Sequence, residues 1–472
     1  MSSDKQLSCD VAVIGAGTAG LAAERAARAN GATTLLIDPH FAGTTCATVG
    51  CMPSKLLIAA SKARRAVLRA EVFGVMATDV EVDDTKLLHR VRAERDRFVS
   101  LTQDSIDEIP DGIRIRAKAR FADSNRLDLD DGRTIAAKTI VIATGSRPSM
   151  PAPFAALGEL ALTNQSVFDI ETLPRRLAVV GAGAIGLELA QAFSGLGVSV
   201  VVFDKGETLA KVRCSRVHAA LKDILAQEID MHLGVEVTPE RIGDEVCVRW
   251  EGKSSGEALF DRVLVAVGRS PVLDGIGLEN AGLPLDDKGV PCHDRATMRC
   301  GDSHVFIAGD VANDLALLHE ASHDGAIAGR NAAAYPAAIE TDRYVPFSIV
   351  FTDPQVVSIG DSEADGAVSG TADFSDQGRA RVEARNEGAL TLYAAAPDGV
   401  LIGADLVAPA GEHLGHLLAW AIQNRMTATQ VLTMPFYHPT IEEGLKQALR
   451  TVCAATPIAP PVTQDTGTPA GG

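Results

Sequence analysis

The sequence has few aromatic residues and no long hydrophobic run. Aromatic side chains make up only 4% of its 472 residues, so aliphatic side chains and alanine must fill the core. No stretch approaches the roughly 20 apolar residues that a membrane span needs. The polar start, Met1 to Asp10, does not resemble a secretory signal. These absences predict a protein that neither crosses a membrane nor binds one.

Cysteine and net positive charge are also scarce. Eight cysteines are too few for a disulfide scaffold in a chain of this length. A cytoplasmic, reducing setting is therefore expected, in which a cysteine pair serves catalysis or metal binding more often than stability. The formal net charge of -17 at pH 7 argues against a nucleic-acid-binding surface. The length itself predicts roughly three domains.

Two segments share a pattern of strand, glycine turn, helix and strand. The hydrophobic runs 11–14 and 177–180 are each followed by GxGxxG and, 23 residues after its first glycine, by an aspartate. These residues are Gly15, Gly17, Gly20 and Asp38 in the first copy, and Gly181, Gly183, Gly186 and Asp204 in the second. The glycines let the backbone approach a pyrophosphate at a helix N-terminus, and the acidic residue accepts hydrogen bonds from a ribose. Either aspartate alone could be a solvated strand end, but the equal spacing favours two dinucleotide sites.

The second copy favours NAD over NADP. Asp204 would face a 2′-phosphate, and two like charges about 4 Å apart repel by on the order of 4 kcal/mol at an intermediate dielectric. A glycine at the third position, Gly186, also suits an NAD site. The basic residues that follow, Lys205, Lys211 and Arg213, would attract a 2′-phosphate and so favour NADP.

A pair of cysteines, Cys46 and Cys51, follows the first copy closely. Five residues rise about 7.5 Å along a regular helix, whereas the Cα atoms of a disulfide usually lie roughly 4.4–6.8 Å apart. A bridge here therefore needs a bent segment, and a strained bridge is easily reduced. A helix beginning near Pro53, with Lys55 close by, favours the thiolate form of a cysteine. The alternative is a pair of buried structural thiols.

Several other segments fit the same plan. Residues 139–148 and 264–271 each form a strand followed by a turn, where the chain is expected to cross between domains. Residues 304–310 form a strand with an acidic tip, and residues 241–260 alternate as short β segments. From about 346 onward, strands are followed by a helix at 412–425, and the Pro-, Thr- and Gly-rich tail is predicted to be disordered.

Together these residues resemble the flavin-dependent pyridine nucleotide–disulfide oxidoreductases over about residues 9–450. Within the family the sequence is most similar to dihydrolipoamide dehydrogenases. The resemblance rests on both glycine motifs, on Cys46 and Cys51 followed by Pro-Ser-Lys, on Ala143-Thr144-Gly145, on Ala308-Gly309-Asp310, and on His438-Pro439-Thr440-Ile441-Glu442-Glu443.

The resemblance implies an α/β fold with two Rossmann-like dinucleotide-binding domains, for FAD and NAD, and a C-terminal α+β dimerisation domain. The expected boundaries are 1–148 and 272–345 for the two parts of the FAD domain, 149–271 for the NAD domain, 346–454 for the dimerisation domain and 455–472 for the disordered tail. A homodimer is implied, and a lipoyl-bearing acyltransferase complex is the partner class that the family suggests.

The resemblance also implies residue roles. Cys51 would lie against the flavin, Cys46 would exchange with a small dithiol or disulfide, and His438, oriented by Glu443, would act as base and acid across the dimer interface. Lys55 and Glu188 would lie near the flavin ring. The implied FAD-binding residues are Gly15, Gly17, Gly20, Asp38, Thr45, Lys55, Thr144, Gly145 and Asp310, and those for NAD are Gly181, Gly183, Gly186, Asp204 and Gly268.

Chemistry supports the histidine independently, because an imidazole titrates where thiols need a proton partner and a carboxylate can orient its ring. A lone histidine would more often be a packed or surface residue, and Glu188 could be an ordinary helix-face charge. The six other cysteines show no metal-binding spacing, so no metal site is predicted: Cys9, Cys214, Cys247, Cys292, Cys300 and Cys453.

The sequence departs from the family pattern at three places. Thr44 replaces a usual glycine, Asp38 replaces a usual glutamate, and Phe436-Tyr437 stand where many dihydrolipoamide dehydrogenases have His-Ala. The expected activity is NAD-linked oxidation of dihydrolipoamide. The alternatives are a glutathione reductase-like enzyme, which would usually prefer NADPH, and a mercuric reductase-like enzyme, which would carry a C-terminal cysteine pair where only Cys453 lies. A docking subunit or redox sensor without catalysis would not need all of these motifs together.

Overall fold

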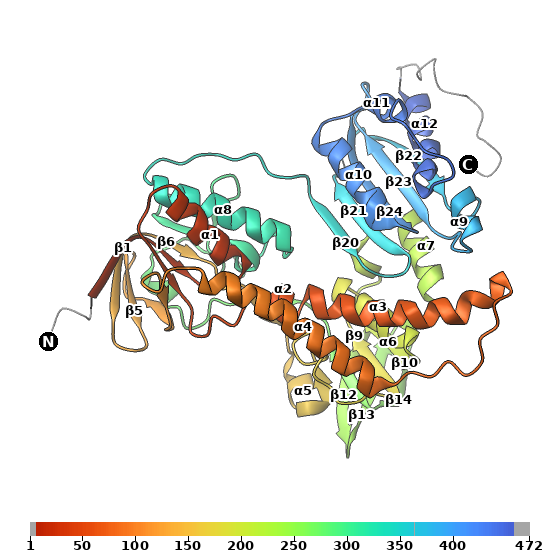
Figure 1. Ribbon diagram of the computed structural model, residues 1–472, viewed down its shortest axis with the longest axis horizontal. Helices are drawn as coiled ribbons and strands as arrows, with labels where there is room; N and C mark the ends of the chain where they lie inside the picture. Colours follow the sequence, from red (N-terminus) through yellow and green to blue (C-terminus); the bar gives the residue numbers. More distant parts are fainter. Residues whose placement is uncertain (1–5, 363, 457–472) are drawn as a thin grey trace. The chain divides into compact units, whose positions relative to one another are not determined.

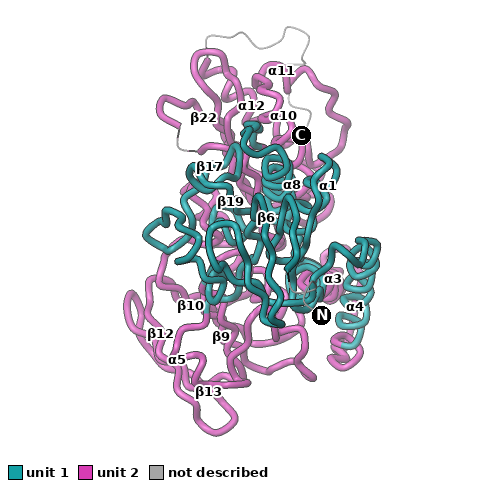
Figure 2. Tube along the Cα trace, turned by 90° about the vertical axis from the view of Figure 1, so that its left-hand side faces the viewer, with its two compact units in different colours: residues 1–53, 89–149, 268–343 teal, residues 54–88, 150–267, 344–472 magenta. Residues whose placement is uncertain are grey.

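The structure is a computed structural model that describes residues 6–362 and 364–456. The chain forms two compact units, each assembled from three segments (Figure 2). The first unit comprises residues 1–53, 89–149 and 268–343, and the second comprises residues 54–88, 150–267 and 344–472. The predicted tail at 455–472 falls outside the described residues from 457 on, and α12 includes Ala455.

The first unit is built on a nine-stranded sheet whose main path has the order β17-β18-β19-β6-β1-β2-β3. The strand β1 pairs in parallel with both β2 and β6, so the predicted strand at 11–14 lies inside the sheet. Its residues from Val11 to Ile14 are buried, which explains their uninterrupted apolar character. The helices α1 and α8 pack side by side against this sheet (Figure 1).

The strands of the first unit are β1 (Gln6–Ile14), β2 (Thr34–Ile37), β3 (Arg114–Ile115), β4 (Ala119–Phe121), β5 (Arg126–Leu129), β6 (Thr134–Ile142), β7 (Ser146–Pro148), β16 (Arg269–Pro271), β17 (His293–Asp294), β18 (Arg299–Cys300) and β19 (Val305–Ile307). Its helices include α1 (Thr18–Ala29), α2 (Thr45–Thr48), η4 (Leu278–Asn280), η5 (Gly309–Ala312) and α8 (Leu318–Ala334). Two further helices, α3 (Cys51–Leu68) and α4 (Asp84–Asp107), each contain residues of both units.

The second unit repeats the glycine-turn plan on a five-stranded sheet with the order β11-β10-β9-β15-β8. Here β9 pairs in parallel with both β10 and β15. A separate three-stranded antiparallel sheet, β12-β13-β14, confirms the short β segments predicted near 241–260. These elements are η1 (Arg69–Phe73), α5 (Ala152–Ala155), η2 (Gly158–Leu160), β8 (Ala161–Leu162), β9 (Arg176–Val180), α6 (Ala184–Gly195), β10 (Ser199–Asp204), η3 (Leu209–Lys211), α7 (Ser215–Leu225), β11 (Asp230–Leu233), β12 (Val235–Ile242), β13 (Glu245–Gly252), β14 (Gly256–Phe260) and β15 (Arg262–Val265).

The C-terminal part of the second unit is an antiparallel sheet with helices, in the strand order β20-β21-β24-β23-β22. The helix α10 packs against β21 and β24, and α12 packs against β22 and β23. The predicted helix at 412–425 is α10, which begins one residue earlier and ends two residues earlier than expected. These elements are β20 (Phe347–Val350), β21 (Gln355–Gly360), β22 (Val368–Asp373), α9 (Gly378–Val382), β23 (Ala389–Ala394), β24 (Leu401–Ala408), α10 (Gly411–Gln423), α11 (Ala428–Leu432), η6 (Ile441–Gly444) and α12 (Leu445–Ala455).

Candidate active site

In the first glycine turn, two glycines lie in close contact with backbone carbonyls and the third faces open space. Gly15 has a φ of 103°, and a Cβ atom there would lie 2.4 Å from the carbonyl oxygen of Ala143. A Cβ atom at Gly20 would lie 1.8 Å from the carbonyl oxygen of Gly15. At Gly17, by contrast, a Cβ atom would meet nothing within 4 Å. The turn therefore leaves open space at the N-terminus of α1, where a pyrophosphate fits.

The second glycine turn has nearly the same geometry. A Cβ atom at Gly181 would lie 2.3 Å from the carbonyl oxygen of Ala266, and one at Gly186 would lie 1.9 Å from that of Gly181. Gly183 again faces open space, at the N-terminus of α6. The residues of both turns thus fit a dinucleotide, each at the carboxyl end of a central parallel strand.

Both aspartates bind backbone amides of their own glycine turn. The Oδ2 atom of Asp38 accepts the amide of Ala16 at 3.0 Å, and that of Asp204 accepts the amide of Ala182 at 2.5 Å. The other oxygen of Asp204 accepts the amide of Gly206 at 2.6 Å. Each aspartate is half-buried at the end of its strand and therefore also stabilises the turn.

Asp310 lies in a polar cluster of the first unit. Ser146 donates its hydroxyl to Asp310 at 2.6 Å, and the guanidinium of Arg269 lies 3.7 Å from the same carboxylate. Burial lowers the pKa of Arg269, and the charge of Asp310 acts in the opposite direction. A Cβ atom at Gly309 would lie 2.7 Å from that of Ala19 in α1, so only a glycine lets the Asp310 turn approach the first glycine turn this closely.

The predicted residues Thr144, Gly145 and Gly268 lie beside the paired strands β7 and β16. Thr144 donates its hydroxyl to the carbonyl oxygen of Val272 at 2.6 Å. Gly145 and Gly268 have φ angles of 71° and 128°, and neither position has a neighbour within 4 Å of an added Cβ atom. The two similar sequence segments therefore meet as one antiparallel pair.

The cysteine segment is bent, as a bridge between Cys46 and Cys51 would require. Cys46 lies in the short helix α2, whose first residue is Thr45, and Cys51 begins α3. Gly50 separates the helices, and a Cβ atom there would lie 2.8 Å from the carbonyl oxygen of Thr45 and 3.2 Å from the Cα atom of Cys46. Cys46 is half-buried and Cys51 is exposed.

Lys55 and Glu188 are brought together within the second unit. The ammonium of Lys55 lies 2.8 Å from Oε2 of Glu188, and the same oxygen accepts the hydroxyl of Ser54 at 3.1 Å. Oε1 of Glu188 accepts the amide of Phe351 at 2.9 Å, and the ammonium of Lys55 lies 4.1 Å from the centroid of the Phe351 ring. Glu188 is a buried, fully paired carboxylate, not a charge on the outer face of a helix.

His438 and Glu443 form a hydrogen-bonded dyad. Nδ1 of His438 lies 3.0 Å from Oε2 of Glu443, which also accepts the amide of Thr440 at 3.3 Å. The side chain of Glu443 is 3% exposed and that of His438 is 55% exposed. The imidazole is therefore oriented through Nδ1, and its exposed side is left for a reaction partner.

The contacts around these groups add residues that the sequence did not single out. Ser146 and Arg269 could have been found, because each follows a glycine in one of the two similar segments. Lys446 is three residues beyond Glu443 on a helical spacing, which is a weaker signal. Nothing in the sequence pairs Phe351 with Lys55.

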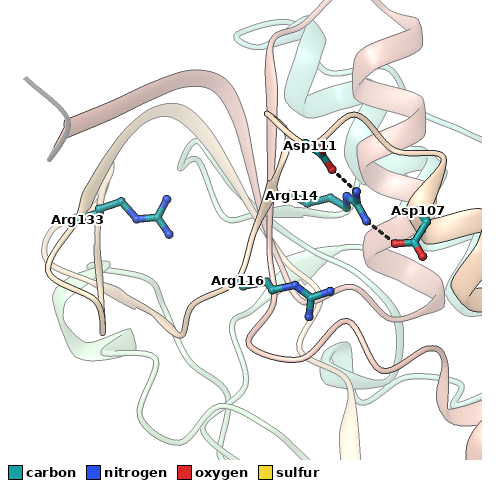
Figure 3. A pocket seen from close by; sticks show the side chains of 5 residues that line it. All are labelled: Asp107, Asp111, Arg114, Arg116 and Arg133. Atoms are coloured by element: carbon teal, nitrogen blue, oxygen red, sulfur yellow. Dashed lines mark hydrogen bonds and ion pairs between the residues drawn. The ribbon is translucent and has the colours of Figure 1, made fainter.

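A separate pocket of about 400 Å³ adjoins the end of β2 in the first unit and contains none of the predicted site residues (Figure 3). Arg116 donates to the carbonyl oxygen of His40, two residues after Asp38. Arg114 bonds to both Asp107 and Asp111, and these ion pairs raise its pKa. The pocket is lined by Asp107, Asp111, Arg114, Arg116 and Arg133. Two of its arginines pair with aspartates, Arg114 with Asp107 and Asp111 and Arg133 with Asp131.

Within residues 6–362 and 364–456, no group of three or more histidine, cysteine or acidic side chains is arranged to hold a metal ion. Among the helices of these same ranges, none combines the length and the apolar character that crossing a membrane requires.

Comparison with known sequences identifies the class of protein that this fold and these sites define. Residues 9–325 match the family described as pyridine nucleotide-disulphide oxidoreductase, and residues 346–449 match the dimerisation domain of that family. The chain therefore belongs to the pyridine nucleotide-disulphide oxidoreductases. The two family matches confirm the resemblance and the expected fold class. Members of this family use FAD and NAD(H), which confirms the expected cofactors.

Individual relatives differ in activity. A dihydrolipoyl dehydrogenase of Haloferax volcanii is 33% identical over 93% of this chain and 95% of its own length. One of Bacillus subtilis is 30% identical over 96% and 98%. A mercuric reductase of Shigella flexneri is also 33% identical, over 93% of this chain and 80% of its own length. The chain is an oxidoreductase of this family, and overall identity alone does not separate the two activities.

Solved structures share the fold. LpdA of Mycobacterium tuberculosis has a TM-score of 0.80 at 24% identity, with 93% of this chain and 99% of that chain covered. The HOCl-induced flavoprotein disulfide reductase RclA of Escherichia coli has a TM-score of 0.79 at 21–22% identity, with 93–94% of this chain and 98–99% of that chain covered across its structures. The match to the dimerisation domain supports a homodimer.

Proposed function

We propose that the protein is an NAD-linked dihydrolipoamide dehydrogenase that works through a Cys46–Cys51 disulfide. The observation that carries the proposal is the His438–Glu443 dyad, because oxidising a dithiol requires a group that removes thiol protons near neutral pH. The imidazole is held at Nδ1 by a buried carboxylate and exposed on its other side. The reaction also needs a site for FAD and a site for NAD, and the two glycine turns fit these two dinucleotides.

The proposed exchange uses each sulfur in turn. One substrate thiol gives its proton to His438 and attacks Cys46, which forms a mixed disulfide and expels Cys51 as a thiolate. The second substrate sulfur then attacks its own partner in the mixed disulfide and displaces Cys46, which takes up the proton of that second thiol. The substrate leaves as a cyclic disulfide, and the enzyme holds two electrons as a Cys46 thiol and a Cys51 thiolate, with one proton on His438. FAD, when bound, supplies the two-electron carrier that returns the disulfide and passes the electrons to NAD.

The chain's own residues prepare these steps. The bend at Gly50 brings the backbone of the second cysteine's segment against that of the first. Cys51 begins α3, where unpaired amides favour a thiolate. In the dimer, His438 serves the cysteines of the partner chain.

The substrate assignment rests on the surface around the dyad. Tyr437 is 82% exposed, and the ammonium of Lys446 lies 5.1 Å from the centroid of the Phe436 ring. Aromatic surface suits the small cyclic disulfide of lipoamide, whereas glutathione disulfide carries several charges and needs basic anchors. A lipoyl group carried by an acyltransferase complex in the cytoplasm is the matching physiological partner.

Steady-state assays with dihydrolipoamide, glutathione disulfide and Hg(II), each with NAD(H) and NADP(H), test the proposal. We expect kcat/KM for dihydrolipoamide with NAD to exceed that for glutathione disulfide by at least about tenfold, or roughly 1.4 kcal/mol. Cys46→Ser abolishes turnover, and His438→Gln costs about 10²- to 10⁴-fold. Equal or reversed efficiencies would exclude the dehydrogenase assignment, and a nearly wild-type His438→Gln would remove the dyad's role.

Mercuric reduction is the second candidate, because one relative of that activity is as similar as the dehydrogenases. The C-terminal cysteine available to it, Cys453, is 2% exposed within α12 and lies 3.5 Å from the hydroxyl of Thr429. A buried thiol is a poor entry ligand for a metal ion, which favours the dithiol activity. NADPH oxidation that depends on Hg(II) and exceeds the dehydrogenase rate would reverse this order.

A further inference from the structure

The buried carboxylate of Glu443 has a cationic partner as well as His438. The ammonium of Lys446 lies 3.2 Å from Oε1 of Glu443, while Nδ1 of His438 and the amide of Thr440 approach Oε2. The side chain of Lys446 is 20% exposed, and its ammonium also lies over the ring of Phe436. The two oxygens of Glu443 are thus divided between the ammonium of Lys446 and the imidazole of His438.

We propose that Lys446 is a positioning residue that keeps Glu443 ionised and limits its pull on the His438 proton, so that the dyad works as a base near neutral pH. The inference rests on the proposed function, because it assigns a regulator to the base of that reaction. Neither the nucleotide turns nor the cysteines enter it.

The charge balance of the carboxylate supports this role. Burial raises the pKa of Glu443, but the hydrogen bonds from Lys446, from the Thr440 amide and from His438 outweigh burial and leave that pKa below its ordinary value. Without Lys446, burial is opposed by fewer donors, so Glu443 takes up a proton at a higher pH. Where Glu443 is still ionised, its undivided charge holds the imidazolium more strongly. While Glu443 is protonated it does not orient the ring as an acceptor, and while it is ionised it holds the imidazolium more strongly, so the oriented base forms only at higher pH.

The other charged groups near the dyad do not duplicate Lys446. The short helix α9 packs against η6 and carries Arg379 and Arg381, which lie 2.6 Å from Glu383 and 2.8 Å from Asp376. Asp373, at the end of β22 against α12, lies 3.3 Å from Arg216. The remaining acidic side chain of η6 is that of Glu442.

The decisive experiment is the pH dependence of kcat/KM for dihydrolipoamide with NAD, measured on the holoenzyme. Lys446→Met removes the charge and keeps the length of the side chain. We expect kcat/KM of the wild type to fall at low pH, and this fall is the acid limb of the profile. We expect the acid limb of Lys446→Met to lie about one pH unit higher, because one positive charge near the partly exposed ring of His438 is lost. Activity is then about tenfold below wild type at pH 6 and approaches it near pH 9. Lys446→Arg, which restores a cation, returns the limb toward its wild-type position.

A matched control removes a charge from the same helix. Arg450 lies one turn beyond Lys446 on α12, and we expect Arg450→Met to leave the acid limb in place. Lys446→Gln provides a second neutral side chain, and the thermal unfolding midpoint and flavin content show whether each variant is folded. An unmoved limb in folded Lys446→Met, an equal shift in Arg450→Met, or no rescue by Lys446→Arg would overturn the proposal.

These outcomes are separate from the fate of the proposed function. If His438→Gln loses about 10²-fold or more while Lys446→Met is unchanged, the dyad stands and the role of Lys446 is wrong. If His438→Gln itself remains within a few-fold of wild type, the proposed base is wrong and no shift in Lys446→Met can be assigned to it.

Discussion

The two glycine turns are nearly identical, but their surroundings differ. In both, the first glycine lies against the carbonyl of the residue that directly follows the neighbouring strand, β6 or β15. The second glycine faces open space, and the third lies against the carbonyl of the first. The helix after the first turn is fixed inside its unit by two more glycines: a Cβ atom at Gly325 or Gly329 of α8 would lie 2.2 Å from the carbonyl oxygen of Ala19 or 2.1 Å from that of Ala23.

The second turn is bordered by exposed ion pairs instead. Lys205, next to Asp204, lies 3.0 Å from Glu236, and Glu207 lies 2.6 Å from Lys253. All four side chains are more than half exposed. We propose that the first turn holds the cofactor that stays bound, and that the second, beside these exposed ion pairs, holds the nucleotide that exchanges at each turnover.

The largest expected effect comes from filling the third glycine position. Gly20→Ala and Gly186→Ala each place a methyl group within 2 Å of a carbonyl oxygen, so the backbone must move. Overpacking of this kind typically costs about 1–3 kcal/mol. We expect Gly20→Ala to lose most of its FAD, measured as flavin absorbance per protein, and to unfold at a lower temperature. Gly186→Ala stays yellow, but its KM for NAD rises at least about tenfold. If both variants lose flavin equally, the two turns are not distinct in function.

Removing the aspartates is expected to have the next largest effect. Asp204→Ala loses a charged acceptor for two amides and, in the proposed site, for the ribose, and such hydrogen bonds are worth about 1.5–3 kcal/mol. We expect KM for NAD to rise about 10- to 100-fold and the preference over NADP to narrow, whereas Asp38→Ala weakens FAD retention instead. Asp204→Asn keeps an acceptor oxygen without the charge and separates the two causes. A wild-type preference for NADP would contradict this role of Asp204.

Both turns could be predicted because their geometry is local. The strands, glycines and aspartates lie within about 25 residues of one another, and the apolar runs that precede them are buried as expected. A bend between Cys46 and Cys51 was predicted on the condition that the two form a disulfide, because a straight helix holds them too far apart, and the structure has such a bend at Gly50.

Contacts that depend on distant parts of the chain were not predictable. Phe351, which directly follows β20, contacts Glu188 and Lys55, and no periodicity in the sequence links these three positions. The amides bound by Asp38 and Asp204 were missed because a spacing shows which residues are near but not which atoms bond. Lys446 lies only three residues beyond Glu443, but that spacing does not show that Glu443 is buried, which is what makes the pair important.

A smaller effect is expected at the second glycine of each turn. Because a Cβ atom at Gly17 or Gly183 meets no protein atom within 4 Å, Gly17→Ala and Gly183→Ala should fold like the wild type. The added methyl group faces the proposed pyrophosphate position, so we expect FAD affinity to fall in the first variant and NAD affinity in the second, each by a few-fold to tenfold. Isothermal titration and thermal unfolding check both statements. A fall in stability without a change in affinity would show that the open space is not a nucleotide site.

The smallest effect is expected from the charges around the second turn. Lys205 could bind the 2′-phosphate of NADP, but its ammonium lies near Glu236, and both side chains are more than three-quarters exposed. Exposed ion pairs are worth about 0–1 kcal/mol and are screened by salt, so the pair neither holds Lys205 rigidly nor contributes much. We therefore expect Lys205→Ala and Glu236→Gln each to change the ratio of kcat/KM for NAD and NADP by less than about threefold at 0.15 M salt. Because Asp204 carries its charge at the turn itself, its substitution should exceed either change clearly. A tenfold gain for NADP in Glu236→Gln that disappears in the double variant with Lys205→Ala would instead make this exposed pair, and not Asp204, the determinant of nucleotide preference.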